Sequence, residues 1–145
     1  MGHESRKACI LVIEDNPADV ALLRLALEHA ELDCDLTVLE DGGQALAFIR
    51  EPGSATSASG LELVILDLNL PKNDGLEILE AMRASEAFSE IPVAILSSSS
   101  STRERARMEK FSVNRFITKP ADLEEFMKIG LYVKELLEST RRSGR

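Results

Sequence analysis

The chain has 145 residues, of which 44% are hydrophobic and 29% are charged, a balance that suits one globular domain around a single core. Its formal net charge of -8 argues against binding to nucleic acid, because proteins that bind phosphate backbones usually carry a basic face. Two cysteines without metal-ligand spacing, a polar segment 1–7 and the lack of a bilayer-length apolar run favour a reduced, cytoplasmic protein with a flexible N-terminus and no membrane association.

Short apolar runs alternate with amphipathic segments along the chain. The runs expected to form strands are Ala8–Ile13, Asp35–Leu39, Leu63–Leu66, Val93–Leu96 and Arg115–Ile117. The segments expected to form helices are Pro17–Glu31, Gly43–Arg50, Gly75–Ala84, Thr102–Lys110 and Asp122–Ser139. Continuous apolar strands separated by helices indicate a parallel sheet that is covered on both faces. The sequence therefore predicts an α/β three-layer sandwich with a five-stranded parallel sheet.

The first helix carries clear starting signals. Asn16 can accept a hydrogen bond as the residue before the helix, and Pro17 suits the first helical position. Asp19 lies in the first turn, where the helix dipole favours an acidic side chain. We therefore expect this helix to begin directly after the acidic pair Glu14-Asp15.

The last helix has more apolar surface than one buried stripe requires. One face contains Leu123, Phe126, Gly130, Val133 and Leu137. Neighbouring helical positions widen this face by Ile129, Tyr132 and Leu136. Two explanations remain open, a broad contact with the sheet or a homodimer in which Ile129, Tyr132 and Leu136 are buried against a second protomer.

Charged residues stand at the ends of three apolar runs. Glu14 and Asp15 close the first run, Asp67 ends the third, and Lys119 with Pro120 follows the last. Because the carboxyl ends of parallel strands share one crevice, we expect these side chains to meet there. Crowded carboxylates repel one another, and a hard cation such as Mg²⁺ relieves the repulsion. The residue types describe a phosphorylation site built around a divalent cation, with a lysine as a second positive charge.

Four motifs in this order resemble the receiver domain of bacterial two-component response regulators, the class that includes the chemotaxis receiver. The motifs are Val12-Ile13-Glu14-Asp15-Asn16-Pro17, Leu66-Asp67-Leu68-Asn69-Leu70-Pro71 with Asp74-Gly75, Ile95-Leu96-Ser97-Ser98 and Phe116-Ile117-Thr118-Lys119-Pro120. The resemblance implies a doubly wound, flavodoxin-like (βα)5 fold. It places a single receiver domain at 8–139, followed by a polar tail at 140–145.

The resemblance also assigns roles within the pocket. It implies that Asp67 is the phosphoacceptor, which takes a phosphoryl group from a histidine kinase as other carboxylate nucleophiles do. The implied metal ligands are Glu14, Asp15, Asp67 and the backbone carbonyl of Asn69, and the implied metal is Mg²⁺, for which Mn²⁺ can substitute. The implied phosphate-binding residues are Lys119, Ser97 and Ser98.

Two further positions match the switch residues of the family. Ser97 corresponds to its Ser/Thr position and Phe116 to its aromatic position, so phosphorylation is expected to draw in the Ser97 hydroxyl and turn Phe116 inward. Glu14, Ser97 and Phe116 are variants of the commoner Asp, Thr and Tyr, and Phe116 has no hydroxyl to anchor it. In the family the peptide bond between Lys119 and Pro120 is cis, an isomer that proline makes accessible.

The expected function is that of a stand-alone signalling switch, which catalyses only its own phosphorylation and dephosphorylation and is otherwise not an enzyme. The segments 16–20 and 119–126 look like those of receivers that accompany bacterial phytochrome-type kinases. The expected partners are a sensor histidine kinase and a downstream protein or phosphotransfer protein. Two alternatives are a phosphorylation-independent dimerising module and a phosphohydrolase of the haloacid dehalogenase type, although Asp15 lacks that family's second acid two residues later.

Overall fold

The computed structural model describes residues 7–51, 53, 58–68, 75–98 and 102–143. The strands in this part of the chain are β1 (Ala8–Ile13), β2 (Cys34–Leu39), β3 (Leu61–Asp67), β4 (Val93–Ser97) and β5 (Arg115–Thr118). The helices there are α1 (Pro17–His29), α2 (Gly42–Arg50), α4 (Gly75–Ala84), α5 (Thr102–Glu109) and α6 (Leu123–Ser143). The predicted alternation of strands and helices is therefore confirmed. Asn69 and most of the predicted flexible N-terminus, 1–7, lie outside the described residues.

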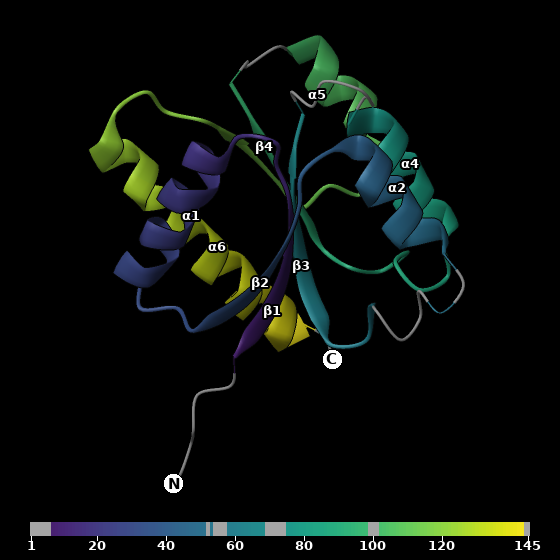
Figure 1. The fold of residues 1–145 in the computed structure, drawn as a ribbon, viewed down its shortest axis with the longest axis horizontal. Coiled ribbons are helices and arrows are strands. Elements are labelled where there is room, and N and C mark those ends of the chain that lie inside the picture. Colours follow the sequence, from purple (N-terminus) through teal and green to yellow (C-terminus); the bar gives the residue numbers. More distant parts are fainter. Residues whose placement is uncertain (1–6, 52, 54–57, 69–74, 99–101, 144–145) are drawn as a thin grey trace, which may run out of the picture.

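The five strands form one parallel sheet in the order β2-β1-β3-β4-β5. Helices α1 and α6 cover one face of this sheet, and α2, α4 and α5 cover the other (Figure 1). This arrangement is the predicted doubly wound three-layer sandwich. The winding changes direction between β1 and β3, and ligands of such sheets bind beside the carboxyl ends of the strands at that point.

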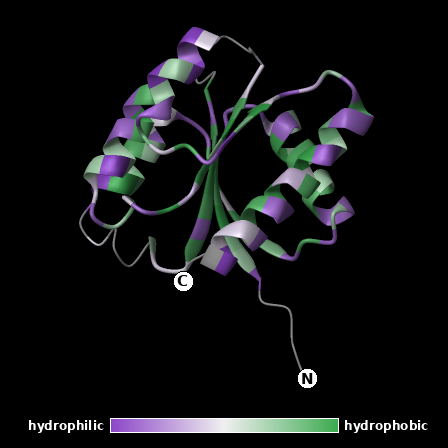
Figure 2. Cartoon of the chain, turned by 180° about the vertical axis from the view of Figure 1, so that it is seen from behind, coloured by the Kyte–Doolittle hydropathy of each residue, from purple (hydrophilic) through white to green (hydrophobic). Residues whose placement is uncertain are grey.

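Alternate residues of the strands point to opposite faces and build two cores. The core beneath α1 and α6 contains, among others, Ile10, Val12, Ile65, Leu96, Leu23, Phe126, Ile129 and Val133. The core beneath α2, α4 and α5 contains, among others, Leu11, Ile13, Leu66, Ile95, Ile49, Leu79, Phe88 and Met108. Figure 2 shows the result, an apolar sheet between helices whose outer faces are polar. Both faces of the central strands are buried, so their polar carboxyl ends are held firmly.

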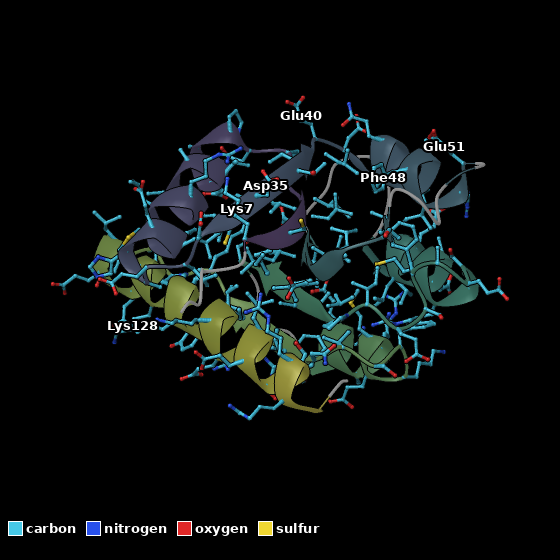
Figure 3. The ribbon with its side chains drawn as sticks, turned by 90° about the horizontal axis from the view of Figure 1, so that it is seen from below. Lys7, Asp35, Glu40, Phe48, Glu51 and Lys128 are labelled. Atoms are coloured by element: carbon cyan, nitrogen blue, oxygen red, sulfur yellow. The ribbon has the colours of Figure 1, made fainter. Side chains whose placement is uncertain are left out.

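Phe48 of α2 packs against the core, whereas Lys128 of α6 lies at the surface. Phe48 of α2 and Phe88 pack edge to face, with ring centroids 6.1 Å apart. The view from below shows Phe48 beside α2, and it shows Lys128 pointing outward from α6 (Figure 3). The ion pair of Lys128 with Glu125, 3.0 Å long, is exposed and contributes little to stability.

Helix α1 begins as its sequence predicts. The side-chain oxygen of Asn16 accepts a hydrogen bond from the main-chain N–H of Ala18 at 2.9 Å, and Pro17 occupies the first turn. This cap replaces one of the hydrogen bonds that the first turn cannot make internally. The start of α1 is thereby fixed three residues after Glu14, beside the carboxyl end of β1.

Helix α6 is longer than predicted and includes most of the expected polar tail, 140–145. Arg141 lies in its last turn and donates from Nε to Oε1 of Glu62 at 2.8 Å, which ties this turn to β3. Basic residues are also favourable at a helix C-terminus because of the helix dipole. Polar residues at 140–142 therefore continue the helix. Residues 144–145 lie outside the described residues.

The second apolar stripe of α6 is mostly a contact with the sheet. Ile129 is 0% exposed, so the prediction that it lies in a dimer surface is wrong, because a helix lying flat on a sheet buries more than one stripe. Tyr132 and Leu136 are half-buried against the same core, and their role in a homodimer stays a prediction. Leu123, expected on the buried face, is 59% exposed because it begins the helix and no preceding turn covers it.

Arg83, in the last turn of α4, ties two connections to that helix. Its guanidinium donates five hydrogen bonds of 2.8–3.3 Å to the main-chain carbonyls of Phe88, Ser89, Ile91, Phe111 and Ser112. These carbonyls belong to the connection before β4 and the connection between α5 and β5. Since β4 and β5 both end at the candidate site, Arg83 supports the site from the opposite end of the strands.

Replacing this guanidinium should lower the stability of the fold. Arg83→Met keeps much of the apolar stem but removes all five of these hydrogen bonds, so we expect the free energy of unfolding to fall by about 2 kcal/mol. Urea denaturation measures the change. The same substitution at the exposed Arg107 of α5 is the control and should stay within about 0.5 kcal/mol of the parent. Equal effects at both positions would contradict the role given to Arg83.

Within the described ranges, none of the helices combines the length and the apolar character needed to cross a bilayer.

Candidate functional site

The carboxyl ends of four adjacent strands bring the predicted polar residues together. Glu14 and Asp15 directly follow β1, Asp67 is the last residue of β3, Ser97 is the last residue of β4, and Lys119 directly follows β5. The order β1-β3-β4-β5 makes these strands neighbours in the sheet. The predicted convergence of Glu14, Asp67 and Lys119 is therefore confirmed, although Glu14 and Lys119 are 105 residues apart in the sequence.

The ammonium group of Lys119 lies among three carboxylates. Its Nζ atom is 2.8 Å from Oδ2 of Asp19, 2.9 Å from Oε1 of Glu14 and 3.5 Å from Oδ2 of Asp67. The first two distances are those of charge-assisted hydrogen bonds, and the third is longer than such a bond. Lys119 therefore neutralises part of the negative charge that the strand ends accumulate.

Burial makes the protonation state of Glu14 unusual. Its side chain is only 3% exposed, and its second oxygen accepts the main-chain N–H of Asn16 at 3.2 Å. Burial and a hydrogen bond with Asp67 raise the pKa of Glu14 to about 7, against the opposing effect of the Lys119 ammonium. Burial alone would lower the pKa of Lys119, but Asp19, Glu14 and Asp67 together raise it, so this lysine stays charged.

Three carboxylates of the site are close enough to share a metal ion. One oxygen from each of Glu14, Asp15 and Asp67 lies within 4.8 Å of the other two. Glu14 and Asp67 are buried, whereas Asp15 is exposed, so the group opens to the surface on one side. Hard oxygen donors with one accessible side fit Mg²⁺ or Mn²⁺, which retain water ligands. The donor set therefore matches the metal expected from the sequence.

The main chain connects Lys119 directly to β4. The N–H of Lys119 donates to the carbonyl of Ser97 at 2.7 Å, which continues the β4–β5 pairing past Thr118. The described residues contain no cis peptide bond, so the bond from Lys119 to Pro120 is trans, an outcome that the sequence left open. Trans is the more stable isomer by about 0.5–1 kcal/mol, and with it the ammonium already reaches Glu14.

The predicted switch residues occupy different environments. Ser97 is 6% exposed, while Ser98 is exposed and lines a surface hollow of about 480 Å³ together with Lys119 and Asp19. Phe116 is half-buried against the core of the α5 side, and the guanidinium carbon of Arg105 lies 4.9 Å from its ring centroid. A cation over the ring face is attractive. Phe116 has no hydroxyl that could hold it in place, but its ring is in contact with Arg105.

Asp19 has a second role that its sequence position alone does not indicate. Its position in the first turn of α1 predicted a favourable interaction with the helix dipole only, yet its carboxylate also binds Lys119 from outside the acidic group of three. A usable signal was its place four residues after Asp15, in the first turn of α1, on the same strand-end edge. Its side chain is 23% exposed, so it lies at the rim of the site.

The fold and this pocket define a class of protein in which a doubly wound sheet holds an acidic cluster and one lysine at its strand ends. Residues 10–129 match the model of the response regulator receiver domain family. The chain therefore belongs to the response regulator receiver domain family, as the four motifs indicate.

Individual relatives agree with this family over nearly the whole chain. Response regulator Rcp1 of Synechocystis is 33% identical over 120 residues, which cover 83% of this chain and 82% of that protein. The crystal structure of the phosphorylated cyanobacterial phytochrome response regulator RcpA is 34% identical, with a TM-score of 0.80 and coverage of 93% and 96%. The Mn²⁺-bound structure of Rcp1 is 31% identical, with a TM-score of 0.76 and coverage of 88% and 91%.

Proposed function

We propose that the protein is a phosphorylation switch in which Asp67 accepts a phosphoryl group. The observation that carries this proposal is the meeting of Asp67 with Glu14 and Lys119 at adjacent strand ends, where the lysine ammonium lies 3.5 Å from the Asp67 carboxylate. A carboxylate beside a permanent positive charge can receive an anionic phosphoryl donor that unpaired carboxylates would repel. The relatives, which are response regulators, support the same role.

The chemistry follows from the position of the Asp67 oxygen. This oxygen attacks the phosphorus atom of a phosphohistidine, an O–P bond forms, and the P–N bond of the donor breaks. The histidine departs and takes up a proton, and Asp67 is left as an acyl phosphate. Lys119 holds the oxygens of the transferred group, as lysine does elsewhere for phosphate.

Glu14, Asp15 and Asp67 are the residues that would hold Mg²⁺, with Asn69, outside the described residues, as a fourth ligand through its carbonyl. Their oxygens lie within 4.8 Å of one another, and the Mn²⁺-bound form of Rcp1 supports a divalent cation in this family. When bound, the ion offsets negative charge that develops on the phosphoryl oxygens. Asp15, the exposed member, is the ligand nearest to solvent and suits entry of the cation.

The proposed response begins at Ser97. A phosphoryl group adds about 1.5 to 2 negative charges and strong acceptor oxygens, to which the buried Ser97 hydroxyl can donate and which Ser98 can also contact. Movement of Ser97 frees space for Phe116 to leave its contact with Arg105 and turn inward. Helix α5 is suited to respond because Met108 is its only buried residue. The surface of α5, β5 and α6 then changes its shape.

The proposed partners follow from the relatives and from that surface. The likeness to a phytochrome response regulator supports a phytochrome-type sensor histidine kinase as the phosphoryl donor. A downstream protein or a phosphotransfer protein would read the altered surface. Tyr132 and Leu136, both half-buried on α6, are the residues that a homodimer through this helix would contact. The proposed function needs no catalytic activity beyond self-phosphorylation and self-dephosphorylation.

Mass spectrometry tests the proposal directly. Incubation with acetyl phosphate and Mg²⁺ should add one labile phosphoryl group to the intact chain, and chelation of the metal should prevent it. Asp67→Asn keeps the shape of the side chain but removes the nucleophile, so this variant should remain unmodified. Modification of Asp67→Asn to the same extent as the parent, or no modification of the parent, would refute the proposal.

A further inference from the structure

Asp19 binds the lysine more closely than the phosphoacceptor does. The distance from Nζ of Lys119 is 2.8 Å to the Asp19 carboxylate but 3.5 Å to that of Asp67. The Lys119 side chain is 12% exposed and that of Asp19 is 23% exposed, so the ion pair is shielded from much of the solvent. Asp19 lies outside the group of three carboxylates, Glu14, Asp15 and Asp67, that can share a cation.

We propose that Asp19 is a positioning residue that holds Lys119 in a resting position and competes with the phosphoryl group on Asp67 for its ammonium. The inference rests on the proposed function and adds a residue to it. Helices α1 and α6 lie side by side on one face of the sheet (Figure 1), and Lys119 precedes α6 by four residues. The contact from Asp19 to Lys119 therefore joins the first turn of α1 to the connection that leads into α6.

The competition follows from the hydrogen-bonding capacity of an ammonium group. Lys119 has three N–H donors, and two of them already reach Asp19 and Glu14 at hydrogen-bond length. A phosphoryl oxygen on Asp67 can take the third, but the ammonium must move closer to Asp67 to make a full-strength bond. Such a movement lengthens the contact with Asp19, so the strength of that contact opposes binding of the phosphoryl group.

A metal ion affects the two resting partners of Lys119 differently. Glu14 belongs to the group of carboxylates that can share a cation, so a bound ion would neutralise its charge. Asp19 lies outside that group and keeps its charge for Lys119 after the ion has bound. Asp19 is thus the partner that continues to hold the lysine back in the metal-loaded site.

Replacing Asp19 should strengthen binding of a phosphoryl group. Asp19→Asn keeps the size of the side chain, weakens its hold on Lys119 and removes one negative charge from the surroundings of the phosphoryl group. We expect affinity for beryllofluoride, a phosphoryl analogue, to rise about two- to fivefold at saturating Mg²⁺, the scale of one partly exposed ion pair. A residue that only supported the structure would, when replaced, weaken binding instead.

The experiment is an isothermal titration of the whole chain with beryllofluoride in saturating Mg²⁺, together with a titration with Mg²⁺ alone. Glu28→Gln is the matched control because Glu28 is an exposed acid on the same helix and loses the same charge. Asp19→Asn should bind beryllofluoride more tightly than both the parent and Glu28→Gln. Its affinity for Mg²⁺ alone should not exceed that of Glu28→Gln. Asp19→Ser provides a second variant with the same expected direction.

The possible outcomes separate this inference from the proposed function. If the parent binds beryllofluoride but Asp19→Asn and Asp19→Ser bind it equally or more weakly, the role of Asp19 is refuted and the proposed function stands. An equal gain in Glu28→Gln would also refute it, because the effect would then be one of general charge. If the parent does not bind beryllofluoride at all, both fail together.

Discussion

The metal-free protein should be more stable at about pH 5 than at about pH 8, with a difference of up to about 3 kcal/mol from Glu14 alone. Burial and the hydrogen bond with Asp67 raise the pKa of Glu14 from 4.5 to about 7 in the folded state. Between these values the folded protein binds more protons than the unfolded chain, so stability falls as pH rises. The contribution is fully present below the unfolded pKa and is lost as pH rises through the folded pKa.

Urea denaturation across this pH range, with a chelator present, measures the effect. Glu14→Gln cannot ionise, so its curve should be flatter and its stability at about pH 8 should exceed that of the parent. Added Mg²⁺ should stabilise the parent more at high pH than at low pH, because the cation favours the ionised carboxylate. A parent curve as flat as that of Glu14→Gln would contradict the prediction.

This pH dependence has a functional meaning under the proposed switch. A buried carboxylate that is costly to ionise makes the empty pocket less stable than the metal-loaded one at neutral pH. Lys119 offsets part of that cost through its 2.9 Å contact with Glu14, which is shorter than its 3.5 Å contact with Asp67. The same arrangement prepares the site for a cation and keeps the lysine near the phosphoacceptor.

The sequence predicted the elements well because their signals are local. The apolar runs and the capping residue Asn16 lie within the segments they define, and both bounds of the helix Gly75–Ala84 agree with the prediction. The end of α6 was predicted too early because residues 140–142 are polar. The ion pair from Arg141 to Glu62 joins positions 79 residues apart, and no local pattern indicates it.

The members of the site could be predicted from one rule, that the carboxyl ends of parallel strands share a crevice. Parallel strands place Glu14, Asp67 and Lys119 at one edge regardless of their distance in the sequence. The contact of Asp19 with Lys119 was not predicted, because the helix dipole at the start of α1 already explains an acidic residue at this position. Ile129 was misplaced because helical periodicity gives the width of an apolar surface but not which part of it the sheet covers.

Gly130→Ala should be strongly destabilising, by about 3 kcal/mol, because α1 and α6 meet at this glycine. A Cβ atom there would lie 2.0 Å from the carbonyl oxygen of Ala26, 2.7 Å from its carbonyl carbon and 3.1 Å from Cβ of Ala30. The first two atoms belong to the backbone of α1 and cannot rotate away. The helices must separate, which opens the core that they share with β1.

The opposing effect of the substitution is much smaller. Alanine favours a helix over glycine by about 1 kcal/mol, so the gain in propensity cannot offset the clash. Gly43→Ala in α2 is the matched control, since its Cβ would meet only the Asp41 side chain at 3.2 Å, and it should change stability by less than about 1 kcal/mol. Urea denaturation of both variants measures the difference. If Gly130→Ala matched Gly43→Ala, α1 could move away from α6 at little cost, and the close approach would not hold Asp19 against Lys119.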